Sequence, residues 1–205
     1  MATSTQRESH SDLLDRYLRA FESAPARTRV FVEVGAGLTT ATIARHAQRL
    51  GARFLCCDTD ERLLRAIGES INRDGVVEFQ AGDSEAVLTR IATWVQRIDF
   101  AFLDAAPSAM KTFAEFRILE RRFAPGSVLV LDNAAIPGAE PPSLPCRKGK
   151  ILVPYLLASA HWEVVGHPQS GDAMIAAIRH DAATWSDPAY EWDDYPGDDW
   201  RRRIP

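Results

Sequence analysis

The chain has 205 residues, of which 46% are hydrophobic and 25% charged, an ordinary composition for a globular domain that buries a sizeable core. Its net charge of −4, without a long basic stripe, argues against a dedicated nucleic-acid-binding protein. The sequence contains neither an apolar run long enough to cross a membrane nor an N-terminal secretion signal, and its three cysteines form no disulfide or zinc pattern. We therefore expect a cytoplasmic protein with no nucleic-acid or membrane partner.

The ends of the chain differ from its centre. Apolar residues share one face of a predicted helix that Ser11 would cap and that ends near Pro25. The last residues combine many aspartates with aromatic side chains, which disordered tails usually lack. We expect one domain over residues 1–205, with a helical extension (1–27), a core (28–180) and a tail (181–205) that packs on its own domain or on a second subunit. Either end would suit a homodimer.

Strands and helices alternate through the core. The predicted strands are Val30–Val34, Arg53–Cys57, Val76–Gln80, Asp99–Leu103, Ser127–Leu131, His161–Val165 and Ala173–Arg179. The predicted helices are Leu38–Leu50, Arg62–Asn72, a segment ending near Val95, Ser108–Phe123 and Lys150–Ala160. This alternation predicts an α/β fold: a doubly wound, mostly parallel seven-stranded sheet with helices on both faces. The last two strands are too close for a crossover helix, so they form a C-terminal antiparallel hairpin.

The turn after the first predicted strand indicates a ligand site. Gly35-Ala36-Gly37 follows Val30–Val34 and precedes a helix, an arrangement that allows a sharp turn and the close approach of a ligand. A dinucleotide-binding turn would carry a third glycine, but Thr40 stands there. Glu33 would also repel a pyrophosphate and suits a cationic group such as the ammonium of an amino acid. The pattern predicts a nucleoside-like cofactor that carries a positive charge.

Acidic residues follow the second and third predicted strands. Asp58 lies 21 residues beyond Gly37, a spacing that suits a carboxylate hydrogen-bonded to a ribose diol. Asp83 and Ser84 follow the next strand, where an adenine amino group could be recognised. Asp83 could equally be the cap of the following helix, as could Asp60.

Hard oxygen ligands follow the fourth and fifth predicted strands. Asp104, Asp132 and Asn133 would meet at one edge of the sheet, and this set suits Mg²⁺, Mn²⁺ or Ca²⁺. A metal there would bind a substrate hydroxyl and lower its pKa. Alternatively, Asp104 caps the next helix and Asp132-Asn133 form a turn. The sequence leaves both interpretations open.

From about residue 28 to residue 180, the chain resembles the class I, Rossmann-like methyltransferases that use S-adenosylmethionine (SAM). It resembles more narrowly the metal-dependent small-molecule O-methyltransferases of the catechol and caffeoyl-CoA type and their antibiotic-biosynthesis relatives. The matching segments are 32–37, 57–60, 82–84, 100–105 and 125–133. The resemblance implies that SAM is bound by Glu33, Gly35, Ala36, Gly37, Thr39, Asp58, Asp83, Ser84 and Asp104. It also implies that Asp104, Asp132 and Asn133 bind a divalent cation such as Mg²⁺.

One position departs from the family pattern. A lysine usually stands three residues after the first metal aspartate, and here that position is Pro107. Lys111 lies about one helical turn further on, so we predict Asp104 and Lys111 as the catalytic residues. The alternatives are that the metal alone deprotonates the substrate, or that the site does not methylate oxygen. The histidines are more typical of surface or structural positions.

The sequence therefore predicts a SAM-dependent methyltransferase of secondary metabolism that methylates a small molecule at a hydroxyl, with a divalent cation. A metal-independent N- or C-methyltransferase on the same scaffold is the first alternative. A nicotinamide-dependent oxidoreductase is disfavoured by Thr40 and Glu33. A non-catalytic SAM-binding subunit remains a further alternative, because fold-level likeness does not establish chemistry.

Overall fold

The computed structural model describes residues 8–25, 27–71, 75–105, 108–139, 147–171 and 173–181. Its helices are α1 (His10–Arg19), α2 (Thr40–Leu50), α3 (Glu61–Ile71), α4 (Ser84–Ala92), α5 (Ala109–Leu119) and α6 (Gly149–Leu157). Its strands are β1 (Val30–Val34), β2 (Arg53–Asp58), β3 (Val77–Ala81), β4 (Ile98–Leu103), β5 (Phe123–Asp132), β6 (Trp162–His167) and β7 (Met174–Arg179). Among the described residues, no helix has both the length and the apolar character needed to cross a bilayer.

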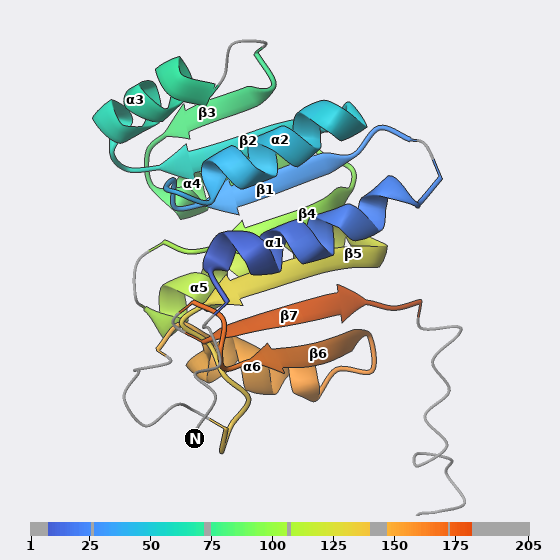
Figure 1. Ribbon diagram of the computed structural model, residues 1–205. Coiled ribbons are helices and arrows are strands. Elements are labelled where there is room, and N and C mark those ends of the chain that lie inside the picture. The colour runs from blue at the N-terminus through green and yellow to red at the C-terminus, as the bar shows by residue number, and fades with distance from the viewer. Residues whose placement is uncertain are drawn as a thin grey trace, which may run out of the picture.

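The strands form one sheet in the order β3-β2-β1-β4-β5-β7-β6 (Figure 1). Strands β1 to β5 pair in parallel, whereas β7 runs antiparallel to both β5 and β6. This arrangement confirms the predicted doubly wound, mostly parallel sheet with an antiparallel hairpin at its C-terminal end. Because chain order reverses direction between β1 and β4, the carboxyl ends of these two strands form a topological switch point, where α/β proteins place ligands.

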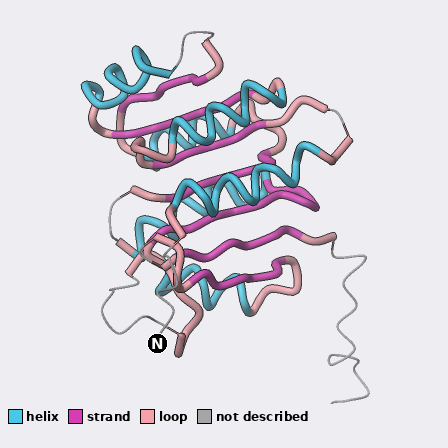
Figure 2. Tube along the Cα trace, viewed as in Figure 1, coloured by secondary structure: helices cyan, strands magenta, loops and turns pink. Residues whose placement is uncertain are grey.

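Helices cover both faces of the sheet, giving three layers (Figure 2). Successive residues of a strand point to opposite faces, so Ala101 and Leu103 of β4 join the core beneath α4, α5 and α6. Phe100 and Phe102 of the same strand join the second core, beneath α1, α2 and α3. All four side chains are essentially inaccessible to solvent.

The N-terminal helix forms as predicted but begins earlier. Ser9, rather than Ser11, is its cap, because the Ser9 hydroxyl accepts from the Asp12 N–H at 3.2 Å while the Asp12 carboxylate accepts from the Ser9 N–H. Leu13, Leu14 and Leu18 on its apolar face are fully buried. The predicted tail lies outside the described residues from position 182 onward, as does Pro107.

The largest boundary error concerns the fifth strand. The structure ends α5 at Leu119, adds a 3₁₀ turn over Glu120–Arg122 and begins β5 at Phe123, four residues before the predicted Ser127. A register shift in the β4–β5 pairing accommodates the extra residues, which include Pro125 and Gly126. Proline and glycine ordinarily indicate a turn, and here they lie in the irregular start of a strand.

Candidate active site

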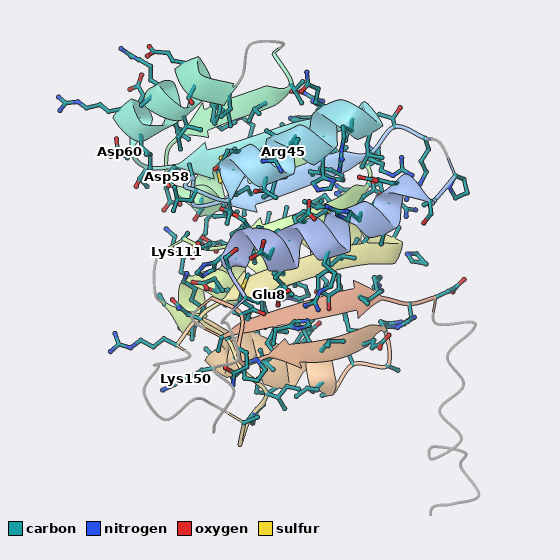
Figure 3. The ribbon with its side chains drawn as sticks, in the orientation of Figure 1. Glu8, Arg45, Asp58, Asp60, Lys111 and Lys150 are labelled. Atoms are coloured by element: carbon teal, nitrogen blue, oxygen red, sulfur yellow. The ribbon has the colours of Figure 1, made fainter. Side chains whose placement is uncertain are left out.

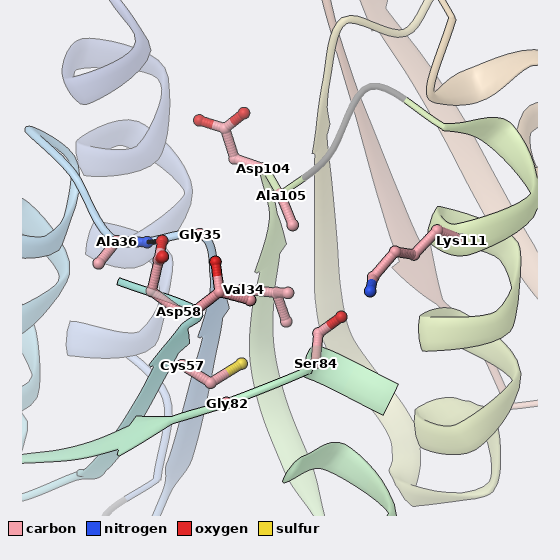
Figure 4. A pocket seen from close by; sticks show the side chains of 11 residues that line it. Val34, Gly35, Ala36, Cys57, Asp58, Gly82, Ser84, Asp104, Ala105 and Lys111 are labelled. Atoms are coloured by element: carbon pink, nitrogen blue, oxygen red, sulfur yellow. Dashed lines mark hydrogen bonds between the residues drawn. The ribbon is translucent and has the colours of Figure 1, made fainter. Parts of the chain in front are cut away.

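A cavity of about 310 Å³ lies at the switch point, at the low end of the roughly 300–1,000 Å³ typical of small-molecule sites. It is lined by Val34, Gly35, Ala36, Cys57, Asp58, Thr59, Gly82, Ser84, Asp104, Ala105 and Lys111 (Figure 4). Figure 3 shows Asp58 and Lys111 at the edge to which the parallel strands point. The cavity thus contains six of the predicted site residues and adds five that were not predicted.

The two glycines of the turn have different structural roles. Gly35 has a φ of +92°, and a Cβ placed there would collide with the backbone carbonyl of Asp104. Glycine is required at this position, and it lets β1 and β4 approach closely where the cavity opens. Gly37 has an ordinary φ, and a Cβ there would meet no described atom within 4 Å. Of these two glycines, the fold itself therefore needs only Gly35.

Glu33 lies behind the glycine turn rather than in the cavity. Its side chain is fully buried, and one carboxylate oxygen accepts a hydrogen bond from the Thr39 hydroxyl at 2.7 Å. Burial raises the pKa of Glu33 to about 7, against the lowering effect of the hydrogen bond from Thr39. Glu33 and Thr39 thus support the turn and the start of α2, and neither lines the cavity where a ligand would contact it.

Asp58 ends β2 with its carboxylate held at the cavity wall. Its Oδ2 accepts from the Ala36 N–H at 2.9 Å, and its Oδ1 accepts from the Asp60 N–H at 2.8 Å. Each oxygen retains further acceptor capacity, which a ligand diol can use. The backbone donors fix the direction of the carboxylate, so the site is preorganised.

Lys111 extends from α5 toward the third-strand side of the cavity. Figure 4 shows its side chain directed toward Ser84 and away from Asp104. Its ammonium pairs with Asp83, which also caps α4 through the Glu85 N–H at 3.1 Å. The hydrogen bond with Asp83 raises the pKa of Lys111, which makes this lysine a poorer base at neutral pH. Asp60 likewise caps α3, so both alternative cap assignments are confirmed.

A cysteine, Cys57, also lines the cavity. Burial raises the pKa of the Cys57 thiol to about 12, so it stays protonated at neutral pH.

Asp104, at the cavity wall, belongs to a cluster of charged and polar side chains that lies beside the cavity. Lys148, only 3% exposed, contacts Asp104 through its Nζ and lies 3.2 Å from Oδ2 of Asp132. The other oxygen of Asp132 lies 2.9 Å from Nε2 of His10, the first residue of α1. Two carboxylates from neighbouring strands are therefore bridged by one ammonium.

These contacts separate the acidities of the two carboxyl groups. Burial, and then the nearby charge of Asp132, raise the pKa of Asp104 to about 6. Burial also acts to raise the pKa of Asp132, but the hydrogen bond from His10 and the charge of Lys148 outweigh it and lower that pKa to about 2.

A close helix–strand contact brings Lys148 to this cluster. Asn133 leaves β5 with a φ of 48°, and a Cβ at Gly149 would overlap the side chain of Ala134. The first turn of α6 can therefore lie directly against the end of β5 only because residue 149 is glycine. This contact places Lys148, the residue before Gly149, against the carboxylate of Asp132.

The described residues do not fit a divalent metal. Among them, no group of three or more histidine, cysteine, aspartate or glutamate side chains could hold a metal ion. Asp104 and Asp132 share the Lys148 ammonium, and Asn133 is in the left-handed conformation of a turn. The alternative of a turn at Asp132-Asn133 is supported, whereas Ser108 rather than Asp104 caps α5.

Sequence reasoning missed both partners of the carboxylates, Lys148 and His10. The sequence suggested no role for Lys148, and the histidines, His10 among them, were interpreted as surface or structural residues. One signal was available: Lys111, Lys148 and Lys150 are the only lysines in a chain that otherwise uses arginine. No spacing in the sequence linked His10 or Lys148 to Asp132.

The sheet order and the cavity at β1 and β4 define a Rossmann-like α/β protein of the class that binds nucleoside-like ligands at a switch point. A family model described as a methyltransferase domain matches residues 32–134, about half of the chain, from within β1 to just past the end of β5. The chain therefore belongs to this methyltransferase family. No curated protein sequence matches it.

Solved structures share this fold at low sequence identity. A SAH-bound methyltransferase from Podospora anserina has a TM-score of 0.64 and 12% identity, covering 83% of this chain and 78% of that one. An O-methyltransferase from Bacillus cereus in complex with SAH has a TM-score of 0.62 and 18% identity, covering 80% and 79%. The CurJ carbon methyltransferase has a TM-score of 0.61 and 16% identity, covering 83% and 54%.

Proposed function

We propose that this protein transfers the methyl group of SAM to a hydroxyl group of a small molecule. The observation that carries the proposal is the preorganised Asp58 carboxylate in a cavity at the β1–β4 switch point. The membership of the methyltransferase family and the SAH complexes of the Podospora and Bacillus proteins support SAM as the cofactor. Bound SAM would supply an electrophilic methyl group on its sulfonium.

The chain contributes mainly binding and orientation to such a transfer. Asp58 would accept hydrogen bonds from the ribose hydroxyls, and Asp83 and Ser84 would lie near the adenine. Gly35 and Ala36 would allow the backbone to contact the methionine part, with Glu33 and Thr39 bracing the turn from behind. Asp104 lines the cavity next to the Lys148 cluster, so it is our candidate for orienting the acceptor hydroxyl and accepting its proton.

Oxygen as the acceptor atom is favoured by the Bacillus protein, and by the polar cluster at one end of the cavity. The CurJ protein is a carbon methyltransferase with a similar TM-score, so likeness of fold does not choose the atom. A metal-independent N- or C-methyltransferase is therefore the second candidate function. Because Lys148 contacts both Asp104 and Asp132, these carboxylates are poorly suited to a metal ion, and this favours a reaction that needs no metal.

Calorimetric titration with SAM, SAH and NAD⁺ tests the cofactor. We expect SAM and SAH to bind and NAD⁺ not to bind. Asp58→Ala should weaken SAM binding at least about tenfold, because it removes the acceptor of the ribose hydrogen bonds. The matched control is Asp60→Ala, since Asp60 caps α3 and does not line the cavity.

Absence of SAM binding by the folded wild-type protein would overturn the proposal. Equal weakening by Asp58→Ala and Asp60→Ala would contradict the role of Asp58. The acceptor atom can then be assigned by incubating the protein with methyl-labelled SAM and a panel of small hydroxylated, amino and carbon-acid compounds.

A further inference from the structure

The chain itself places a cation beside Asp104, at the side of the cavity where we propose that the acceptor binds. Asp104 and Asp132 end two neighbouring strands, and Lys148 contacts a carboxylate oxygen of each. With the proposed function as its basis, we propose that Lys148 takes the place of a divalent cation, so that methyl transfer is metal-independent. Lys148 then acts as a positioning residue that holds the two carboxylates in their orientation.

Burial is the first argument for this role. The Lys148 side chain is 4% exposed and that of Asp132 is 7% exposed, so their charges are withdrawn from water. A buried ammonium is tolerated only where carboxylates compensate it. A metal ion could bind Asp104 and Asp132 only by displacing the Lys148 ammonium, which would then lose both of its carboxylate partners.

The position of Lys148 on its helix is the second argument. Lys148 is the N-cap residue of α6, where the helix dipole disfavours a positive charge. No side-chain cap hydrogen bond is formed by this residue. Lys148 therefore does not serve the helix, and its contacts with Asp104 and Asp132 account for its placement.

Charge balance is the third argument. One ammonium between two carboxylates leaves one net negative charge, which suits a site that receives a cationic sulfonium. A divalent ion added to Lys148 would place three positive charges against the same two carboxylates, in addition to that of the ligand. His10, 2.9 Å from Asp132, already occupies the second oxygen of that carboxylate.

The test measures Mn²⁺ binding by electron paramagnetic resonance, with SAM binding measured by calorimetry on the same samples. Wild-type protein treated with a chelator should bind no Mn²⁺ at this site, and its affinity for SAM should be the same with and without chelator. Lys148→Met keeps the apolar stem and removes the charge. This variant should bind Mn²⁺ at least about tenfold more tightly than wild type, because two carboxylates are freed.

Two further variants make the result specific. Lys150→Met is the matched control: Lys150 is exposed on the same helix, and we expect no gain of Mn²⁺ binding (Figure 3). Adding Asp132→Asn to Lys148→Met should abolish the gain. A lysine that was merely structural would change stability without creating a metal site.

The proposal is overturned if wild-type protein binds Mn²⁺ stoichiometrically and loses it in Asp132→Asn. It is also overturned if folded Lys148→Met gains no Mn²⁺ affinity. Should Lys148→Met not fold, the wild-type titration and its Asp132→Asn variant decide the question alone. Loss of the proposed function would be seen separately, as absence of SAM binding whatever the Mn²⁺ result.

Discussion

The two halves of the carboxyl edge of the sheet use their acidic residues in opposite ways. On the β2 and β3 side, Asp58 is held by backbone N–H groups and keeps acceptor capacity toward the cavity. On the β4 and β5 side, Asp104 and Asp132 share the ammonium of one buried lysine of the same chain. Similar residues at equivalent strand ends therefore form a cavity wall in one half and an ion cluster in the other.

The largest expected effect is a difference in the free energy of unfolding between variants of the two halves. Asp132→Ala removes a partner of the buried Lys148, and we expect it to lower the free energy of unfolding by about 3–5 kcal/mol. Asp58→Ala should cost only about 1 kcal/mol, because the released N–H groups lie beside an open cavity that water can enter. Urea denaturation of both variants measures the difference. Equal losses would refute the distinction between wall and cluster.

The next effect concerns Gly35, which lies where the two halves of the edge meet, between β1 and β4. Gly35→Ala forces a Cβ against the Asp104 carbonyl at a φ that disfavours alanine, and should lower the free energy of unfolding by about 2–3 kcal/mol. Gly37→Ala is the control, with an expected change below about 1 kcal/mol. Urea midpoints compare the two variants. If Gly35→Ala is no less stable than Gly37→Ala, the fold does not depend on the close approach of β1 and β4 at residue 35.

The third expected effect concerns Glu33, which supports the glycine turn from behind, and it depends on pH. Because burial raises the pKa of Glu33 to about 7 from an ordinary 4.5, the folded chain holds this proton at pH values where the unfolded chain has released it. The contribution of Glu33 to the free energy of unfolding therefore falls between about pH 4.5 and pH 7, and is constant above. The total fall should be about 3 kcal/mol.

Glu33→Gln should remove this fall and make the protein relatively more stable at pH 8 than at pH 5, compared with wild type. Urea unfolding at the two pH values measures the change. Glu61→Gln is the control, because the Glu61 side chain is 74% exposed. If Glu33→Gln and wild type keep the same pH dependence, Glu33 does not titrate as its burial implies.

Local sequence was enough to predict most of the fold and the cofactor side of the site. Alternating strands and helices gave the confirmed sheet class, and the convergence of parallel strands at one edge brought Gly35, Asp58 and Ser84 to one cavity. Boundary errors arose where tertiary pairing overrode local signals, as at Pro125 and Gly126 in β5. Glu33 was recognised as unusual, but its orientation behind the turn depends on Thr39 and Cys56 from other elements.

Local patterns along the chain were enough to identify the residues at the strand ends, since β-strand periodicity and turn chemistry are local properties. The side chains that face those residues depend on how distant elements pack. His10 reaches Asp132 from a helix 122 positions away, and Lys148 reaches it because Gly149 packs against Ala134. Such contacts depend on how closely distant elements pack. No spacing along the chain encodes them, and they bring an ammonium and an imidazole to the carboxylates that the sequence predicted as metal ligands.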